Sequence, residues 1–507
     1  MTPGTTILCA ALFGLAATYA LVPIMKRVAL SRDIIAYPGG RRNHQAPIPL
    51  LGGVAIFLPL LVAFSCLLFA DLLGETNFND QFRFKLLSLF LGSCWILLLG
   101  TIDDKMKLSW KKKLAGQIFG VVVLIWGGHT IGSTTIPYIG PVNFGFMGYI
   151  ILGVAVITVT NAVNLIDGID GLAGGVCLFA AITSGIVTFF KNDLVTSALV
   201  FTLAGSLVAY LRFNFHPASI YMGDGGSLTL GFFLSVLATS NMAVSQGQRS
   251  GTMSMMIVPL LPFGVALIDV ALAVVRRWIS GRKIFLPDAD HLHHRFMEVF
   301  GRPRLVVSIF YAFSAVFCVI TISMVLVPES NYLFEAVCFA GFVLIVSMAF
   351  VLRLYRVDQL PTIIKNRPDF KFLSSFHTFM TMRVRKARTL EELLSLMESG
   401  VRDLDFDSVE VNVQGKWSMS WINPTCKHPE SCRNHCNRMF RGSTITVNWV
   451  VPNHDSANYQ RYLELVWHWF LSQSENRARQ LVSSQNHPGR FIRPEDKAAI
   501  SDKKLSA

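Results

Sequence analysis

Four short polar segments interrupt the long apolar stretches of this chain and carry the residue types that could do chemistry. They contain Asp103 and Asp104, the residues from Asn161 to Asp170, Asp224, and the residues from His291 to Arg295. Ionisable groups beside a bilayer are costly to keep and usually mark a working site. Mg²⁺ takes one or two carboxylates and completes its shell with water and phosphate oxygens. The segments therefore indicate metal-assisted chemistry on a phosphorylated substrate at one face of a membrane.

The first segment, Gly100 to Gln117, places two adjacent carboxylates ahead of a group of lysines. Such lysines can bind phosphate groups. They can equally form a solvated loop that only follows the preference of cytoplasmic loops for positive charge. Taken alone, this segment favours the functional interpretation and the solvated loop about equally. The segments that follow it make the functional interpretation the stronger one.

The second segment, Asn161 to Gly175, embeds two amides and two carboxylates between apolar stretches; they are Asn161, Asn164, Asp167 and Asp170. A tight turn between helices needs one such residue rather than four. A functional role is therefore favoured over a plain turn.

The third segment, Phe213 to Ser227, sets Asp224 on a glycine-rich bend in front of an apolar stretch. The glycines let a phosphate or a nucleobase approach the backbone closely, and Asp224 could ligate a metal ion. The alternative is an ordinary loop.

The fourth segment, Gly281 to Arg295, carries His291, His293 and His294. These histidines could suggest zinc, but no acidic or thiol ligand stands at zinc-type spacing beside them, and arginines flank them. Recognition of a phosphate or a sugar fits better, because arginine clamps phosphates and histidine can donate from both ring nitrogens.

Long apolar stretches must position these segments. Of the 507 residues 52% are hydrophobic and 15% are charged, against about 25% charged in soluble domains. No phosphate-binding loop of the GxxxxGKS type and no GxGxxG motif after a strand is present in the sequence. The fold class predicted is an all-α polytopic membrane protein of about 11 transmembrane helices. The predicted spans are 4–25, 50–70, 84–102, 114–127, 147–163, 171–190, 194–211, 227–241, 254–275, 305–327 and 332–352.

The loops between these spans predict the orientation. Lysine and arginine gather in 26–49, 103–113 and 276–304, whereas 128–146 has none and 242–253 has only Arg249. The positive-inside rule makes the first three loops cytoplasmic. The N-terminus is then periplasmic, and the C-terminus and all four polar segments are cytoplasmic. Because the net charge of +13 lies in loops beside apolar spans, we expect contact with the lipid bilayer and no nucleic acid partner.

The composition changes after the membrane domain, which is predicted to span 1–353. A basic linker follows at 354–388, then a small cytoplasmic α+β domain at 389–480, and a disordered tail at 481–507. The elements expected in the domain are a helix from Thr389 to Val401, strands at 408–413 and 444–451, and a helix from Tyr459 to Ser474. Cys426, Cys432 and Cys436 could bind zinc, but their spacing is not a standard one and reduced thiols are favoured.

Together with the early motif Pro38 to Gly53, the four segments closely resemble the polyprenyl-phosphate N-acetylhexosamine-1-phosphate transferases, which form glycosyltransferase family 4. The resemblance covers about residues 1–350. It implies an enzyme of the bacterial cytoplasmic (inner) membrane that transfers a sugar 1-phosphate from a UDP-sugar to undecaprenyl phosphate and releases UMP. Such a reaction begins a cell-surface polysaccharide. The family implies Mg²⁺ as cofactor, with Mn²⁺ as an alternative, and a homodimer.

The resemblance also implies roles for single residues. Asp103, Asp104 and Asp167 match catalytic positions, and Asp224 and Asn164 match positions around the metal. The positions that match substrate-binding residues are Lys111, Asn164, Asp170, Tyr221, Gly223, His291, His293, His294 and Arg295. Gln117 matches the family's amide position. Tyr221 departs mildly from the family, in which phenylalanine is common at this place.

The histidine pattern at 291–295 resembles the branch that uses GlcNAc and differs from the relatives that use a muramyl pentapeptide. UDP-GlcNAc is therefore the expected donor, with UDP-QuiNAc and UDP-FucNAc as alternatives. A rival interpretation is an ion-coupled transporter, but transporters usually place such carboxylates near the midplane and often show internal repeats. The C-terminal domain faintly resembles GAF domains, and we expect it to bind a regulator.

Overall fold

The computed structural model describes residues 2–36, 47–76, 78–136, 140–242, 262–279, 296–297, 300–326, 367–404, 408–413, 417–422, 445–450 and single positions between 463 and 480. The chain forms two compact units. The first comprises Met1–Val274 and Pro287–Leu354, and the second comprises Val275–Leu286 and Tyr355–Ala507.

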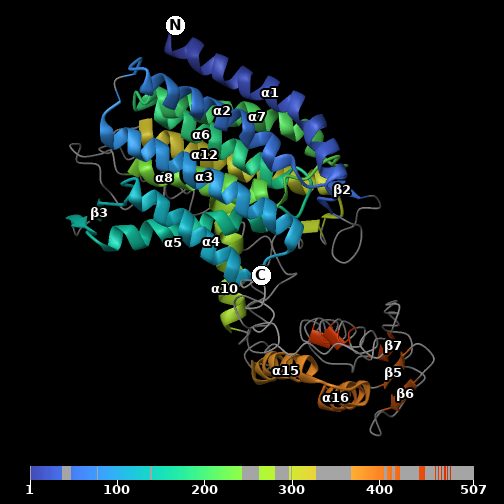
Figure 1. Ribbon diagram of the computed structural model, residues 1–507. Helices are drawn as coiled ribbons and strands as arrows, with labels where there is room; N and C mark the ends of the chain where they lie inside the picture. Colours follow the sequence, from blue (N-terminus) through green and yellow to red (C-terminus); the bar gives the residue numbers. More distant parts are fainter. Residues whose placement is uncertain are drawn as a thin grey trace, which may run out of the picture. The chain divides into compact units, whose positions relative to one another are not determined.

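The first unit is a bundle of long helices (Figure 1). Its described helices are α1 (Pro3–Ser31), α2 (Gly52–Leu72), α3 (Asp80–Met106), α4 (Trp110–Trp126), α5 (Met147–Ile166), α6 (Leu172–Phe190), α7 (Leu194–Asn214), α8 (Gly223–Met242) and α12 (Pro303–Leu326). Helix α10 (Gly264–Ile279) begins in this unit. Polar side chains cap several helix starts: Thr2 caps α1, Asn79 caps α3 and Asp193 caps α7. Each accepts a hydrogen bond from a backbone N–H that the helix leaves without an internal partner.

Two short antiparallel hairpins connect helices of this unit. One pairs β1 (Ile35–Ala36) with β2 (Ile48–Pro49), and the other pairs β3 (Ser133–Ile136) with β4 (Gly140–Asn143). The first hairpin brings the chain back toward the start of α2, where Tyr221 donates to the carbonyl of Pro49 and Gly52 donates to the carbonyl of Tyr221. The segment before α8 is thereby tied to the start of α2.

Seven of the described helices are long and apolar enough to cross a membrane: α1, α2, α3, α5, α6, α7 and α12. Their positions match seven of the predicted spans, and the chain is a multi-pass helical membrane protein. Helix α4 coincides with the predicted span 114–127 and α8 with 227–241, but neither is among the seven. The span 254–275 lies partly, and 332–352 wholly, outside the described residues. The described residues therefore support several membrane spans, and the number of about 11 stays a prediction.

Helix α8 lies in the interior of this unit. Every residue from 225 to 239 is buried, and α8 packs against α2, α3, α5 and α6. Glycines allow the closest of these approaches, because a Cβ atom on Gly53 would overlap Gly226 and one on Gly231 would overlap Thr160. A buried, closely packed helix holds its first turn, and hence Asp224, in a fixed place.

The elements of the second unit that the structure describes over continuous stretches are two helices and a sheet. Helices α15 (Arg367–Lys386) and α16 (Leu390–Asp403) are followed by an antiparallel sheet of order β6-β5-β7. Its strands are β5 (Ser408–Val413), β6 (Trp417–Ile422) and β7 (Ile445–Val450), with Val411 opposite Met419 and Val447. The helix expected from Thr389 and the strands expected at 408–413 and 444–451 lie where α16, β5 and β7 are found. Cys426, Cys432, Cys436 and the tail 481–507 lie outside the described residues.

Thr389 begins α16 with the cap expected from the sequence. Its Oγ1 accepts from the N–H of Glu392 at 3.1 Å, and the Glu392 carboxylate accepts from the N–H of Arg388 at 2.8 Å. We expect Thr389→Ala to lower the free energy of opening of α16 by about 1 kcal/mol, measured as faster amide exchange of residues 390–403 in the full chain. Ser395→Ala, in the middle of the same helix, is the matched control and should not speed exchange. Equal effects of the two changes would contradict the capping role.

Candidate active site

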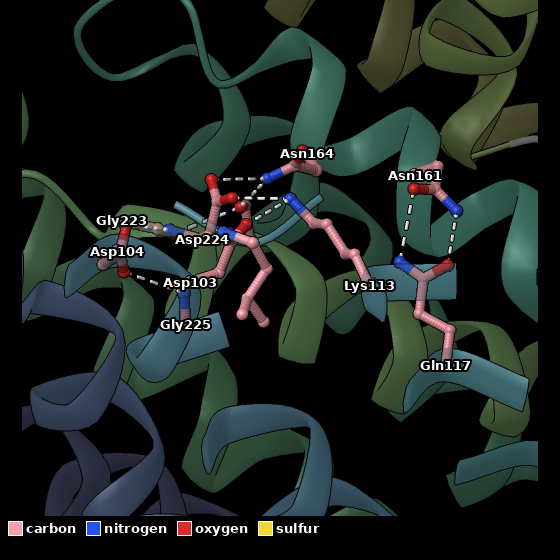
Figure 2. Close-up of polar contacts among 11 residues, drawn as sticks. Asp103, Asp104, Lys113, Gln117, Asn161, Asn164, Gly223, Asp224 and Gly225 are labelled. Carbon is pink, nitrogen blue, oxygen red and sulfur yellow. Dashed lines mark hydrogen bonds and ion pairs between the residues drawn. The ribbon is translucent and has the colours of Figure 1, made fainter. Parts of the chain in front are cut away.

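Four helix ends meet at one end of the bundle. They are the C-terminal ends of α3 and α5 and the N-terminal ends of α4 and α8. Figure 2 shows the polar side chains that they bring together, among them Asp103, Lys113, Asn164 and Asp224. The sequence separates these four residues by up to 121 positions, and the packing of α8 against α3 and α5 unites them.

Asp104 caps the N-terminus of α8. Its two carboxylate oxygens accept from the backbone N–H groups of Asp224 at 2.9 Å and Gly225 at 3.1 Å. Negative charge is favourable at this end of a helix, because the helix dipole and the unpaired N–H groups point there. Asp104 is buried, and both of its carboxylate oxygens contact the backbone at the start of α8.

Asp103 turns to the other side, toward Lys113. One of its oxygens accepts from the N–H of Leu108 at 2.6 Å, and the other lies 2.9 Å from the Lys113 ammonium. The same ammonium lies 2.5 Å from Asp224. Lys113 thus joins two carboxylates that come from different helices (Figure 2).

The pKa of Lys113 is raised above its ordinary value. Burial by itself favours the neutral amine, but the charges and hydrogen bonds of Asp224 and Asp103 outweigh that effect. Lys113 therefore stays protonated near neutral pH and holds a positive charge between the two carboxylates.

Asn164 fixes the second oxygen of Asp224. Its amide nitrogen donates to Asp224 at 3.0 Å and to the Ser227 hydroxyl at 2.8 Å. One helical turn before it on α5, Asn161 exchanges two hydrogen bonds with Gln117 of α4. Asn161 of α5 thus meets Gln117 of α4. Asn164 of α5 meets Asp224, which also contacts Lys113 of α4, as Figure 2 shows.

Lys111 and Lys113 occupy different environments. Lys111 is exposed, and its ammonium lies 5.7 Å from the centre of the Trp110 ring. Lys111 was predicted from the sequence as a substrate-binding residue and Lys113 was not, although Lys113 contacts both Asp103 and Asp224. One signal was available: Lys113 stands four residues before the amide Gln117, which puts both on one face of a helix.

A second polar group lies around Asp170. One oxygen of Asp170 accepts from the N–H of Ala218 at 3.0 Å and contacts Nδ1 of His216 at 2.8 Å. Arg304, at the start of α12, donates to the carbonyl of His216 at 3.0 Å. The side chain of Asn214 joins the same region, because it accepts from the N–H of Gly171 and donates to the carbonyl of Ile220. His216 and Arg304 are further polar residues of this group that were not predicted from the sequence.

The remaining predicted site residues are placed as follows. Asp167 is the C-terminal cap residue of α5 and is partly exposed. Tyr221 is partly exposed and is held through its backbone to the start of α2. Gly223 has a positive φ of 68° beside the carboxylate of Asp104, where a side chain would collide with that carboxylate. His291, His293, His294 and Arg295 lie outside the described residues.

Gly100 lets α3 approach the first residues of α8. A Cβ atom at Gly100 would overlap the backbone of Asp224 and Gly225. We expect Gly100→Ala to displace the start of α8 and to lower the turnover proposed below by about 10- to 100-fold, the equivalent of 1–3 kcal/mol of overpacking. Gly132→Ala is the control, since a Cβ there meets open space. Unchanged turnover with Gly100→Ala would show that α3 and α8 can move apart at Gly100 without disturbing Asp224.

The donor set of the site suits Mg²⁺. Asp103 and Asp224 converge on one positive charge, and two carboxylates are the number that Mg²⁺ takes when phosphate oxygens and water complete its shell. No group of three or more His, Cys, Asp and Glu side chains that could hold a metal occurs in the described part of the chain. Asn164 points its amide nitrogen at Asp224, so in this arrangement it orients that carboxylate.

Known proteins resemble this chain over the segment that contains the site. The sequence profile of glycosyl transferase family 4 matches residues 86–242, which contain Asp103, Lys113, Asn164 and Asp224. A probable undecaprenyl-phosphate N-acetylglucosaminyl 1-phosphate transferase of Bacillus subtilis is 29% identical over 300 residues, which are 59% of this chain and 79% of the relative. A decaprenyl-phosphate N-acetylglucosaminephosphotransferase of Mycobacterium leprae is 30% identical over 366 residues, which are 68% of this chain and 90% of the relative.

A phospho-N-acetylmuramoyl-pentapeptide-transferase of Moorella thermoacetica is 32% identical over 293 residues, which cover 54% of this chain and 83% of the relative. The membrane-spanning helices and the cluster at their ends define an integral membrane glycosyltransferase. More specifically, the chain belongs to glycosyl transferase family 4, the family of the polyprenyl-phosphate N-acetylhexosamine-1-phosphate transferases.

Proposed function

We propose that this protein transfers N-acetylglucosamine 1-phosphate from UDP-GlcNAc to undecaprenyl phosphate and releases UMP. The observation that carries the proposal is the cluster of Asp103, Lys113 and Asp224 at one end of the membrane helices. The cluster offers a positive charge that can bind phosphate groups and two carboxylates that can bind a metal ion. The names of the Bacillus subtilis and Mycobacterium leprae relatives, which specify a polyprenyl phosphate and an N-acetylglucosamine phosphate group, support it.

The proposed reaction exchanges one phosphorus–oxygen bond for another. An oxygen of the lipid phosphate attacks the β-phosphorus of the UDP-sugar, and the bond from that phosphorus to the bridging oxygen breaks. UMP leaves with the bridging oxygen, and the sugar phosphate is joined to the lipid phosphate. A phosphate monoester with a second pKa near 6 is largely a dianion at pH 7. The attack therefore needs no general base, and Asp103 has the task of positioning Lys113 and the metal site.

Lys113 supplies the positive charge that draws the two phosphorylated substrates together. Its ammonium already bridges Asp103 and Asp224, so a phosphate oxygen that enters the site can take the place of one carboxylate contact. Asp224, with Asp103 opposite, would hold Mg²⁺. When bound, Mg²⁺ would neutralise the diphosphate and the charge that develops on UMP. Asp104 and Asn164 keep Asp224 in place for this role.

We further propose that Asp170, Asp167 and Tyr221 contribute to the nucleoside side of the site, and that His291, His293, His294 and Arg295 contact the sugar and its phosphate. The lysines 105, 107, 111 and 112 are exposed around the same end of the bundle. They support a cytoplasmic site, with the N-terminus on the opposite side of the inner membrane. We also propose that the protein acts as a homodimer.

The test is release of UMP by the purified full-length protein in lipid nanodiscs that contain undecaprenyl phosphate and Mg²⁺. UDP-GlcNAc, UDP-QuiNAc, UDP-FucNAc and UDP-MurNAc-pentapeptide are offered in turn. Lipid-dependent release with UDP-GlcNAc that stops on chelation with EDTA and returns with Mg²⁺ supports the whole proposal. Release with a different sugar alone keeps the chemistry and changes the donor. No release with any donor by well-folded protein would overturn the proposal and favour the transporter.

A further inference from the structure

Helix α15 of the second unit has one face that is firmly packed. Leu373, Phe376, Met380 and Val384 recur at helical spacing and are buried. The ring of Phe376 lies 6.3 Å from that of Phe470. At the end of α15, the Arg477 guanidinium donates two hydrogen bonds to the carbonyl of Ala387, at 2.7 and 3.0 Å. The orientation of α15 about its own axis is therefore fixed within this unit.

An adjoining face of α15 carries large apolar side chains that are exposed. Phe372 is 48% exposed, and Phe379 and Met382 are each 53% exposed. Their spacing of seven and three residues places them along one line of the helix, with the small residue Ser375 between them. Three exposed, large apolar groups in a line on one helix indicate a surface that is covered in the working protein.

Basic residues flank this line on the same side of the helix. They are Lys371, Arg383, Arg385 and Lys386, all exposed. Arg383 lies over the Phe379 ring, 5.5 Å from its centre. The sequence contains no acidic residue between Asp369 and Glu391. The exposed face of α15 is thus an apolar stripe bordered by basic side chains from Lys371 to Lys386, with one acidic residue, Asp369, in the first turn of the helix.

We propose that this face of α15 lies on an anionic lipid bilayer, with Phe372, Phe379 and Met382 at the boundary of headgroups and acyl chains. Amphipathic helices with basic borders and aromatic residues bind membranes in this way, and each basic residue near an anionic surface adds to the attraction. The membrane-spanning helices belong to the same chain, so a bilayer is always within reach of the second unit. A second copy fits poorly, because its α15 would bring the same positive charges face to face.

The proposal is tested with the full-length chain in nanodiscs of phosphatidylcholine alone or mixed equally with phosphatidylglycerol. A genetically encoded fluorescent amino acid replaces Phe379, and in a separate sample it replaces Glu391, which is exposed on α16. We expect nitroxide-labelled lipid to quench the fluorophore at 379 and not at 391. We expect amide exchange of residues 367–386 to be at least about tenfold slower in the anionic discs.

Charge reversal separates lipid binding from folding. R383E/R385E/K386E should remove the quenching at 379 and the slower exchange, while exchange of α16 stays as in the unchanged protein. Arg402→Glu, which reverses one exposed charge on α16, is the control and should alter neither readout. Absence of quenching at 379 in both discs overturns the proposal, as does equal quenching in both discs, which would show contact that ignores lipid charge. Protection that appears only at high protein density in the discs would instead identify a second copy as the occupant.

Discussion

Asp224→Asn is expected to lower the rate of UMP release by about 10³-fold or more while the protein remains folded. The carboxylate stands at the start of a buried helix, its backbone is held by Asp104, and its two oxygens contact Asn164 and Lys113. Asparagine keeps the shape of the side chain but removes the negative charge. The site then loses one of the two carboxylates on which Lys113 and the proposed Mg²⁺ depend. The measurement is single-turnover release of UMP over a range of Mg²⁺ concentrations.

Asp80→Asn is the matched control, because Asp80 also lies in the first turn of a long helix, α3, and its side chain is exposed. This change should leave turnover within about twofold of the unchanged protein, as is usual for exposed surface positions. If the Asp224→Asn protein kept most of the UMP-release activity, Asp224 would not be the metal ligand. If added Mg²⁺ restored the activity fully, the carboxylate would serve affinity for the ion and not the chemical step.

The positions of the carboxylates could be predicted from the sequence, because Asp is costly beside apolar spans and therefore conspicuous there. Their separate tasks could not. Asp103 and Asp104 are neighbours in the sequence, but successive residues of a helix point about 100° apart. That rotation sends Asp103 to Lys113 and Asp104 to the backbone of α8. Only the packing of α8 against α3 decides which carboxylate meets which partner.

The membrane helices were predicted well where an apolar stretch is long. Helix α4 has 17 residues, fewer than the roughly 20 that a span needs. It nevertheless carries Lys113 to Asp103 and Asp224, and Gln117 to Asn161 of α5. The contact between Asp170 and His216 was not predicted either, because it joins residues 46 positions apart through the fold of α6 and α7. The hairpin of β3 and β4 lies in a loop to which no element had been assigned.

Replacing Lys113 by methionine is expected to lower the rate of UMP release by about 10²- to 10³-fold. Methionine fills a similar volume and leaves Asp103 and Asp224 facing each other without a cation. Two nearby carboxylates repel, so one of them takes up a proton or moves away. Lys113→Arg keeps the charge and should retain more activity than Lys113→Met. The loss should lie in kcat as well as in KM, because the charge acts on phosphate groups throughout the reaction.

Lys111→Met supplies the comparison that decides between the two lysines. Lys111 is exposed and lies beside Trp110, so its loss should raise KM by a few-fold at most, through weaker attraction of anionic substrates to the surface. The structure therefore predicts a large effect at 113 and a small one at 111, in the same helical turn and with the same substitution. A large loss at 111 with little change at 113 would mean that the working site uses the outer lysine, and that the bridge between Asp103 and Asp224 is only structural.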